Sequence, residues 1–370
     1  MELILQRKES AVTTEKRATT RNVKQISITF LSIMLSMMML QGCDEPGDEK
    51  KDLTGGHGEY YVLCEGIFTQ ADATLWSFNA AYDTVRGPLI WDTAGNPLGD
   101  VGQSFCLDGD TLYIIMNNSH QVRMVDLSGE PSHVGDIDLP GASPRYMAIQ
   151  HGLNRAFISS WNLTGLLVLD LGTHTVTDTV HLAGRPEIVL IDGAKLYASL
   201  TMKSDWSSFN QVVQLDISDT EVTLETSYQV IEGPGDMVLS DDMLYVTGVG
   251  YDATWAATTG TSGIDLTSGE VISVNHGSYV NYTADIDLID GVPYRVFGDG
   301  LVPLNPDLTL NLAATLVQQP NIYSFSVQNG QLMLGSSDYA APDSIHIYSV
   351  LGDSLGTVTV AALPNEVVYY

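Results

Sequence analysis

The chain has 370 residues and a formal net charge of −29, with 16 Lys and Arg residues against 45 Asp and Glu residues. Binding to a polyphosphate needs clusters of Lys and Arg, so this balance argues against a nucleic-acid partner. Long amphipathic helical patterns are almost absent. Gly, Thr, Ser, Asp, Val, Leu and Tyr dominate instead, which is typical of short strands joined by tight turns.

Residues 1–42 are predicted to be a signal peptide that is not part of the fold. Basic residues lead into an apolar, uncharged stretch from Ile26 to Leu40. Leu40-Gln41-Gly42-Cys43 then resembles the lipobox of bacterial lipoproteins, a resemblance that implies cleavage before Cys43 and lipidation of that residue. The alternative is a plain transmembrane anchor, but the stretch falls short of the ~20 apolar residues that span a bilayer.

Residues 43–58 are predicted to be the lipidated Cys and a flexible tether that is acidic and rich in Gly. The acidic run from Asp44 to Glu49 is similar to the surface-export signal of Bacteroidota lipoproteins. That similarity implies a protein held in the outer membrane by its lipid anchor alone and displayed on the cell surface. In enterobacteria, Asp directly after the Cys indicates retention in the inner membrane instead, and this alternative stays open.

From residue 59 onward one strand-like unit recurs, and residues 109–127 give its clearest copy. A short apolar, β-rich run is followed by a loop and by a second run that ends in Asp126. The first run occurs seven times, at spacings of roughly 40 to 50 residues that are typical of propeller blades. Its copies are Tyr60–Leu63, Leu112–Ile115, Ala156–Ser159, Leu196–Ser199, Leu244–Thr247, Pro293–Val296 and Leu332–Gly335.

Three further runs complete each predicted blade. The second run ends in Asp in several copies, and we interpret this Asp as a turn cap whose side chain bonds the backbone two residues on. A polar, β-branched run comes next, as in Thr175–Leu182 and Thr223–Val230, and is expected to be the exposed outer strand. A short apolar run precedes six of the seven units and is expected to be the innermost strand. The capping residues are Asp126, Asp170, Asp216 and Asp265.

The seventh innermost run is absent before Tyr61 and is found at the other end of the chain, in Glu366–Tyr369. The C-terminus is therefore expected to supply the innermost strand of the first blade, because an open ring would expose two sheet edges. A solenoid would predict polar caps at both ends, whereas residues 367–370 are apolar. Residues 59–370 are therefore predicted to form an all-β, seven-bladed β-propeller closed by its C-terminal strand.

Two cysteines, Cys64 and Cys106, remain in the mature chain. Outside the cytoplasm they could form a disulfide. Each lies in an apolar, strand-like run, however, which favours two buried free thiols.

Several stretches of the mature chain resemble the YncE-like (YVTN-type) propeller lipoproteins on the surface of Bacteroidota. Members of this group include lipoproteins that capture cobalamin and pass it to a TonB-dependent transporter, so the resemblance implies those partners. Residues 248–298 match less well, and Cys64 stands where the family usually has Asn. The matching stretches are YVLCEG at 61–66, LGDVGQS at 98–104, LYIIMNNSHQVRMVD at 112–126, SPRYMAI at 143–149, SSWN at 159–162 and AGRPE at 183–187.

A ligand is expected on the face where the blade-to-blade connections meet the loops between second and third strands. Three of the five Trp residues fall in such loops, and exposed aromatic rings favour a flat or amphipathic ligand such as a corrin, a tetrapyrrole or a sugar. The alternative is that each ring packs on its own loop. The predicted ligand-binding residues are Phe68, Arg145, Tyr146, Trp161, Arg185, Trp206, Phe209, Asp236, Tyr251, Trp255 and Tyr339.

Arg145 and Arg185 are expected at equivalent positions of neighbouring blades, close to the mouth of the channel. They could hold a carboxylate or phosphate of the ligand. They could equally form ion pairs with Asp100, Glu187 or Asp236.

Catalysis has little support in the sequence. The eight His residues form no HExxH motif and no cluster with metal-ligand spacing, and no nucleophile elbow is found. His120 and His346 fall near the expected binding face, where a solvated or hydrogen-bonded role is favoured. We therefore predict no catalytic, metal or cofactor-binding residue, although acidic residues in a central channel could support a lactonase-like or metal-assisted reaction.

The leading hypothesis is thus a cell-surface lipoprotein that captures a small nutrient, with cobalamin or a related corrinoid as the first candidate, beside a TonB-dependent outer-membrane receptor. The alternatives are a propeller enzyme, either lactonase-like or quinoprotein-like, and a protein-interaction scaffold.

Overall fold

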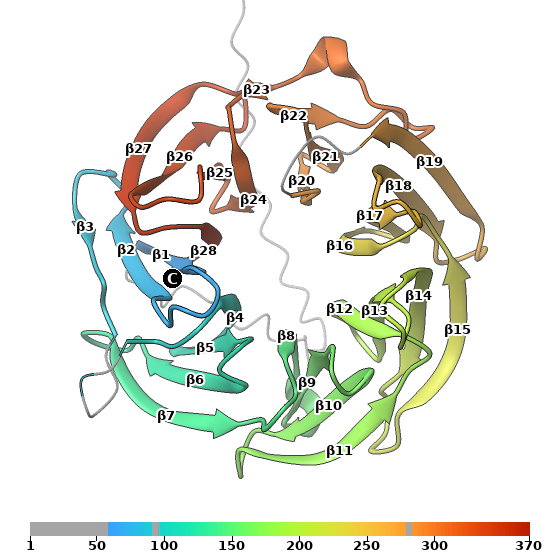
Figure 1. Cartoon of the computed structure of the whole chain (residues 1–370), viewed down its shortest axis with the longest axis horizontal. Coiled ribbons are helices and arrows are strands. Elements are labelled where there is room, and N and C mark those ends of the chain that lie inside the picture. The colour runs from blue at the N-terminus through green and yellow to red at the C-terminus, as the bar shows by residue number, and fades with distance from the viewer. Residues whose placement is uncertain (1–57, 91–94, 96, 279–282) are drawn as a thin grey trace, which may run out of the picture. The chain divides into compact units, whose positions relative to one another are not determined.

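The structure is a computed structural model that describes residues 58–90, 95, 97–278 and 283–370. The predicted signal peptide, Cys43 and nearly all of the predicted tether lie outside the described residues. The described strands form seven four-stranded antiparallel sheets arranged as a ring (Figure 1). The chain is therefore an all-β, seven-bladed β-propeller, as predicted.

Each blade is given from its innermost to its outermost strand. Blade 1 has β28 (Pro364–Tyr369), β1 (Glu59–Cys64), β2 (Thr74–Asn79) and β3 (Val85–Arg86). Blade 2 has β4 (Gly102–Asp108), β5 (Thr111–Met116), β6 (Gln121–Asp126) and β7 (Ser132–Asp138). Blade 3 has β8 (Pro144–Gln150), β9 (Arg155–Ser160), β10 (Gly165–Asp170) and β11 (Thr175–His181), with the 3-10 turn η1 (His151–Leu153) after β8.

The remaining four blades follow the same order. Blade 4 has β12 (Arg185–Asp192), β13 (Lys195–Met202), β14 (Ser208–Asp216) and β15 (Thr223–Gln229). Blade 5 has β16 (Pro234–Ser240), β17 (Met243–Tyr251), β18 (Ala257–Asp265) and β19 (Val271–Ser278). Blade 6 has β20 (Ile286–Ile289), β21 (Val292–Phe297), β22 (Gly300–Pro303) and β23 (Val317–Gln318), with the 3-10 turn η2 (Leu312–Ala314) before β23. Blade 7 has β24 (Ile322–Gln328), β25 (Gln331–Ser336), β26 (Asp343–Ser349) and β27 (Ser354–Val360).

The C-terminal strand closes the ring as predicted. β28 pairs antiparallel with β1, with Tyr369 opposite Tyr60 and Val367 opposite Val62. This pairing removes the free inner edge of β1, which an open ring would expose to water. The last residue continues the contact, because the Tyr370 hydroxyl donates to Asp110 at 2.9 Å.

The hydrophobic core lies between neighbouring blades. Alternate residues of one strand point to opposite faces of its sheet, so the odd and even residues of β5 contribute to different clusters. Leu112 and Ile114 pack with Tyr61 and Leu63 of blade 1, whereas Tyr113 and Ile115 pack towards blade 3. Burial of each aliphatic side chain contributes about 1.5–3 kcal/mol to the free energy of unfolding. These apolar contacts between neighbouring blades hold the ring together.

A ring of polar contacts lies inside this apolar shell. At each of the seven blade boundaries, a side chain near the channel bonds the backbone of the neighbouring blade. Four boundaries use a Ser hydroxyl as donor and three use a buried carboxylate as acceptor. The bonds are Ser104 Oγ to Arg145 O, Ser159 Oγ to Glu187 O, Ser199 Oγ to Gly235 O, Ile286 N to Asp236, Phe325 N to Asp285, Ser324 Oγ to Pro364 O and Phe105 N to Glu366, at 2.6–2.9 Å.

Several local predictions are confirmed. The four Asp residues predicted to cap turns each accept a hydrogen bond from a backbone N–H two residues on. The two predicted outer strands are β11 and β15. Cys64 and Cys106 are free thiols, and burial raises the pKa of each to about 12. In the described part of the chain, no helix has the length and apolar character required to cross a bilayer.

Candidate functional site

The mouth of the central channel is built by one recurring backbone irregularity. In every blade, one residue of the innermost strand lies opposite the fourth residue of the next strand. These inner-strand residues are Val367, Phe105, Met147, Val189, Met237, Ile286 and Phe325. In six blades the register shifts just before or close to this residue, which marks a bulge. We call the residue two places before it the rim position. The rim residues of blades 1 to 7 are Asn365, Gln103, Arg145, Glu187, Gly235, Ala284 and Tyr323, and all of them line the central cavity.

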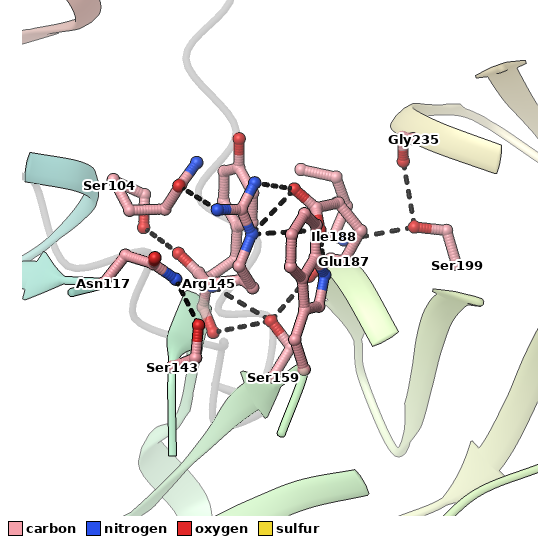
Figure 2. A network of polar contacts seen from close by, with 12 residues as sticks. Ser104, Asn117, Ser143, Arg145, Ser159, Glu187, Ile188, Ser199 and Gly235 are labelled. Carbon is pink, nitrogen blue, oxygen red and sulfur yellow. Dashed lines mark hydrogen bonds and ion pairs between the residues drawn. The ribbon is translucent and has the colours of Figure 1, made fainter. Parts of the chain in front are cut away.

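Polar side chains join the rim of blades 1 to 4 into a continuous chain. Figure 2 shows its central part, where Arg145 meets Glu187. The Asn365 amide donates to the backbone carbonyl of Gln103, whose side-chain oxygen accepts from Arg145. Arg145 then forms a two-pronged ion pair with Glu187, with Nη2 to Oε1 at 2.6 Å and Nε to Oε2 at 3.1 Å. Both side chains of this pair are nearly buried. Of the two roles considered for Arg145, the ion pair with Glu187 is the one present.

Glu187 also fixes the ring of Trp161. The indole Nε1 donates to Glu187 Oε2 at 2.6 Å, and the Arg145 guanidinium lies over the ring at 4.0 Å from its centroid. One buried carboxylate therefore holds a cation and an aromatic ring in fixed positions. Such a charge-assisted network is rigid before any ligand arrives.

Arg185 does not occupy a position equivalent to Arg145, which corrects the sequence-based expectation. The register places Arg185 immediately before the bulge, and Glu187 is the true counterpart of Arg145. The Arg185 guanidinium bonds loop carbonyls of blades 3 and 4, among them Ser204 O at 2.8 Å, and stacks on Trp206 at 3.6 Å from the ring centroid. Arg185 thus connects the Trp161 loop of blade 3 to the Ser204 loop of blade 4, and its guanidinium N–H groups already have protein acceptors.

The three loop Trp residues lie on one face, as predicted, between the second and third strands of blades 3, 4 and 5. The Trp161 and Trp206 rings meet edge to face at 6.2 Å, and Trp206 is 50% exposed. Trp255 is 79% exposed, and its ring centroid lies 6.3 Å from that of Tyr251. The backbone N–H of Tyr251 donates to the hydroxyl of Ser208, the first residue of β14 in blade 4, at 3.0 Å. Blades 3 to 5 thus carry a partly exposed aromatic wall, which we define as Trp161, Trp206, Tyr251 and Trp255.

Three loop aromatics adopt a backbone conformation that bulky residues avoid. φ is 71° at Trp206, 64° at Trp255 and 70° at Tyr339. An Asp side chain in each loop bonds nearby backbone N–H groups and holds the turn, namely Asp205, Asp252 and Asp338. A left-handed conformation costs an L-residue about 1–2 kcal/mol. Strain of this kind persists at functional sites, because the surrounding structure keeps it in place.

Of the other predicted site residues, four lie at the mouth, in the cavity or exposed to solvent, and one, Phe209, packs into the core. Tyr339 contacts Tyr323 edge to face at 6.2 Å, so blade 7 carries a second aromatic pair. The Tyr323 hydroxyl donates to Glu65, which follows β1 of blade 1. Tyr146 and Asp236 line the central cavity. Phe68 is 64% exposed. Phe209 instead packs against the apolar core between blades 3 and 4.

The central cavity below the rim has a volume of about 710 Å³ and carries an excess of acidic groups. Six carboxyl groups and one guanidinium line it. Burial raises the pKa of Glu366 to about 8 and that of Asp285 to about 6. Burial, together with the charge of Asp285, also raises the pKa of Asp236 well above its ordinary value. The lining carboxyls are Glu65, Glu187, Asp236, Asp285, Asp287 and Glu366, and the guanidinium is that of Arg145.

The two histidines near the binding face are hydrogen-bonded, as expected. His120 Nδ1 accepts from the Ser143 N–H at 3.0 Å, and His346 lies 2.9 Å from Ser336 Oγ. Among the described residues, no group of three or more His, Cys, Asp or Glu side chains is placed to hold a metal ion.

Sequence reasoning did not name Gln103, Glu187 or Tyr323 as site residues. Glu187 was named only as a partner for an arginine. A signal was present, since each of these residues lies two places before an apolar residue of an inner strand. Counting the bulge residue in every blade would have aligned them with Arg145.

No protein-family model and no curated protein matches this chain. Solved structures do match. A protein from Lactobacillus plantarum superposes with a TM-score of 0.61 at 15% identity, over 84% of this chain and 98% of that one. A 6-phosphogluconolactonase-like protein from Bacteroides uniformis superposes with a TM-score of 0.59 at 17% identity, over 84% and 99% of the two chains. At these identities the likeness shows the fold alone, a β-propeller with lactonase-like neighbours.

Proposed function

We propose that this propeller is a binding protein that captures a small, flat, amphipathic nutrient at the mouth of its channel. The aromatic wall is the observation that carries the proposal. Two of its four rings are at least half exposed, and Trp206 is held in place by a stacked arginine. Aromatic rings around a cavity of several hundred Å³ are typical of small-molecule sites.

A corrinoid such as cobalamin is the first candidate ligand. Its ring is flat and broad enough to lie on several aromatic side chains at once. The resemblance of residues 61–66, 98–104 and 143–149 to YncE-like lipoproteins of Bacteroidota supports the same candidate. The lipobox at Leu40–Cys43 supports a lipid anchor in the outer membrane, with display at the cell surface and transfer of the ligand to a TonB-dependent receptor.

The charge of the cavity argues against a phosphorylated substrate. Six carboxyl groups line it, and its single guanidinium is already paired with Glu187 at 2.6 Å. The doubly charged phosphate monoester of a sugar phosphate would meet like charges in a partly desolvated site, where repulsion is strong. Binding of a neutral or cationic ligand is therefore favoured over turnover of a sugar phosphate.

A propeller hydrolase acting on an uncharged lactone is the second candidate. The lactonase-like structural neighbour motivates it, together with the buried carboxyl of Glu366, whose pKa of about 8 suits proton donation near neutral pH. Hydrolysis of δ-valerolactone that is lost in Glu366→Gln would support this function over simple capture.

Calorimetric titration of the soluble domain with cyanocobalamin tests the leading proposal. Saturable binding is expected, and the triple variant Trp161→Ala, Trp206→Ala, Trp255→Ala is expected to abolish it. Leu351→Ala serves as the control, because Leu351 is 78% exposed in the turn between β26 and β27, on the opposite face. An affinity that is unchanged in the triple variant would contradict the proposed site.

A further inference from the structure

The rim of the channel is incomplete on one side. Blades 1 to 4 and blade 7 carry long or polar rim side chains, whereas blades 5 and 6 carry Gly235 and Ala284. These two blades are neighbours, so among the described residues their small rim side chains leave one continuous gap in the rim. The cavity extends to the backbone there, and its lining includes Gly233, Gly235 and Gly248.

Gly235 is not required by the backbone. A Cβ built at this position meets only Thr247 O, at 3.9 Å, which is an ordinary van der Waals contact. Gly235 is also absent from the glycines that have positive φ. A side chain is therefore sterically allowed, and it would occupy the cavity as the rim side chains of the other blades do. The absence of a side chain on Gly235 leaves space in the cavity for part of a ligand.

Hydrogen-bond acceptors lie at the base of the gap. Asp236 follows Gly235, and Asp285 follows Ala284 in the equivalent position of the next blade; both line the cavity. Asp236 accepts from the backbone N–H groups of Met237 and Ile286, and Asp285 accepts from that of Phe325, at 2.8–2.9 Å. Asp285 also accepts from the Thr283 hydroxyl. Both oxygens of each carboxyl group keep lone pairs that these bonds do not use, so each group can accept another donor from the cavity.

We propose that this rim gap is a binding subsite, which seats a hydrogen-bond-donating group of the ligand, an amide, a hydroxyl or an ammonium, against Asp236 and Asp285. The inference deepens the proposed binding function of the same cavity and rests on it. The aromatic wall on blades 3 to 5 contacts the flat face of the ligand, and the gap takes its donor-bearing edge. The subsite is defined by described residues alone, and residues 279–282 lie outside them.

The test uses proflavine, a flat tricyclic cation that bears two amino groups, as the probe. The variant Gly235→Gln gives blade 5 the side chain that blade 2 has at its rim, Gln103. The control Gly129→Gln places the same side chain in the turn between β6 and β7, where a Cβ meets nothing within 4 Å. Anthracene-9-carboxylate, a tricyclic anion, reports the sign of the charge preference. All titrations use the same ionic strength, because the negative protein attracts cations nonspecifically.

We expect saturable proflavine binding to the wild type and to Gly129→Gln, and binding about tenfold weaker or more to Gly235→Gln, a loss of about 1.4 kcal/mol. Anthracene-9-carboxylate is expected to bind less well than proflavine. Asp285→Asn, whose amide oxygen can still accept from Phe325, provides a second variant with the same expected loss if Gly235→Gln fails to fold.

Wild-type affinity in a folded Gly235→Gln or in Asp285→Asn would overturn the subsite, and so would the absence of saturable proflavine binding. A protein that binds cyanocobalamin but ignores these substitutions keeps the proposed function and loses the subsite. A protein that responds to them with proflavine but does not bind cyanocobalamin keeps the subsite and loses the corrinoid as its ligand.

Discussion

Replacing Trp255 tests whether the aromatic wall is held in a strained conformation. Trp255 has φ 64° and is 79% exposed, so its side chain contributes little burial. Trp255→Gly relieves about 1–2 kcal/mol of backbone strain. It also adds about 0.5–1 kcal/mol of unfolded-state entropy and loses the ring contact with Tyr251, which is worth about 0.5 kcal/mol. These contributions nearly cancel, so the free energy of unfolding should stay close to that of the wild type.

Trp255→Ala supplies the matched comparison. Ala keeps the strain and loses the ring contact, so we expect the Ala variant to be less stable than the Gly variant by about 1 kcal/mol. Ala is normally the more stabilising residue of the two in regular structure, so the predicted order is reversed. Chemical denaturation followed by circular dichroism measures it. An Ala variant as stable as the Gly variant, or more so, would refute the strain argument.

Three further predictions concern the polar ring and the closure. The unfolded Glu366 carboxyl releases its proton near its ordinary pKa of 4.5 and the folded one near a pKa of 8. The contribution of this one group to the free energy of unfolding is therefore greatest below pH 4.5 and falls as pH rises towards 8. Glu366→Gln keeps an acceptor for the Phe105 N–H and should reduce the dependence of the free energy of unfolding on pH, as measured by urea unfolding. An unchanged pH dependence would contradict the raised pKa of the buried carboxyl. Glu187→Ala removes the acceptor of the Trp161 indole N–H and should free the Trp161 ring, with lower tryptophan fluorescence anisotropy and weaker ligand binding. Identical values would show that Glu187 does not position the ring. Deleting residues 364–370 removes β28 and should give a protein that aggregates or melts far lower, whereas wild-type melting would contradict closure by the C-terminus.

The fold was predictable because its signals are local and repeated. The run from Leu112 to Ile115 has six counterparts, and the missing inner strand before Tyr61 matched the apolar C-terminus. Strand alternation and turn-forming residues are properties of short windows of sequence. Because the same run recurs seven times, each copy supports the assignment of the others as strands.

The site was only partly predictable because its geometry depends on register and burial. One bulge residue makes Glu187, and not Arg185, the counterpart of Arg145, and that shift becomes visible only when the apolar inner-strand residues of all blades are aligned. The inward packing of Phe209 and the raised pKa of Glu366 depend on residues far away in the chain. The face that carries the loop Trp residues was predictable, since it follows from strand order alone.

The central claim is that ligand binds across the aromatic wall and the rim gap, and hydrogen–deuterium exchange with and without bound cyanocobalamin tests it most directly. The account predicts slower exchange in the loops around Trp161, Trp206 and Trp255 and at the start of β16, with no change in the turns on the opposite face, such as the one at Leu351. Protection confined to that opposite face or to the outer strands would contradict it.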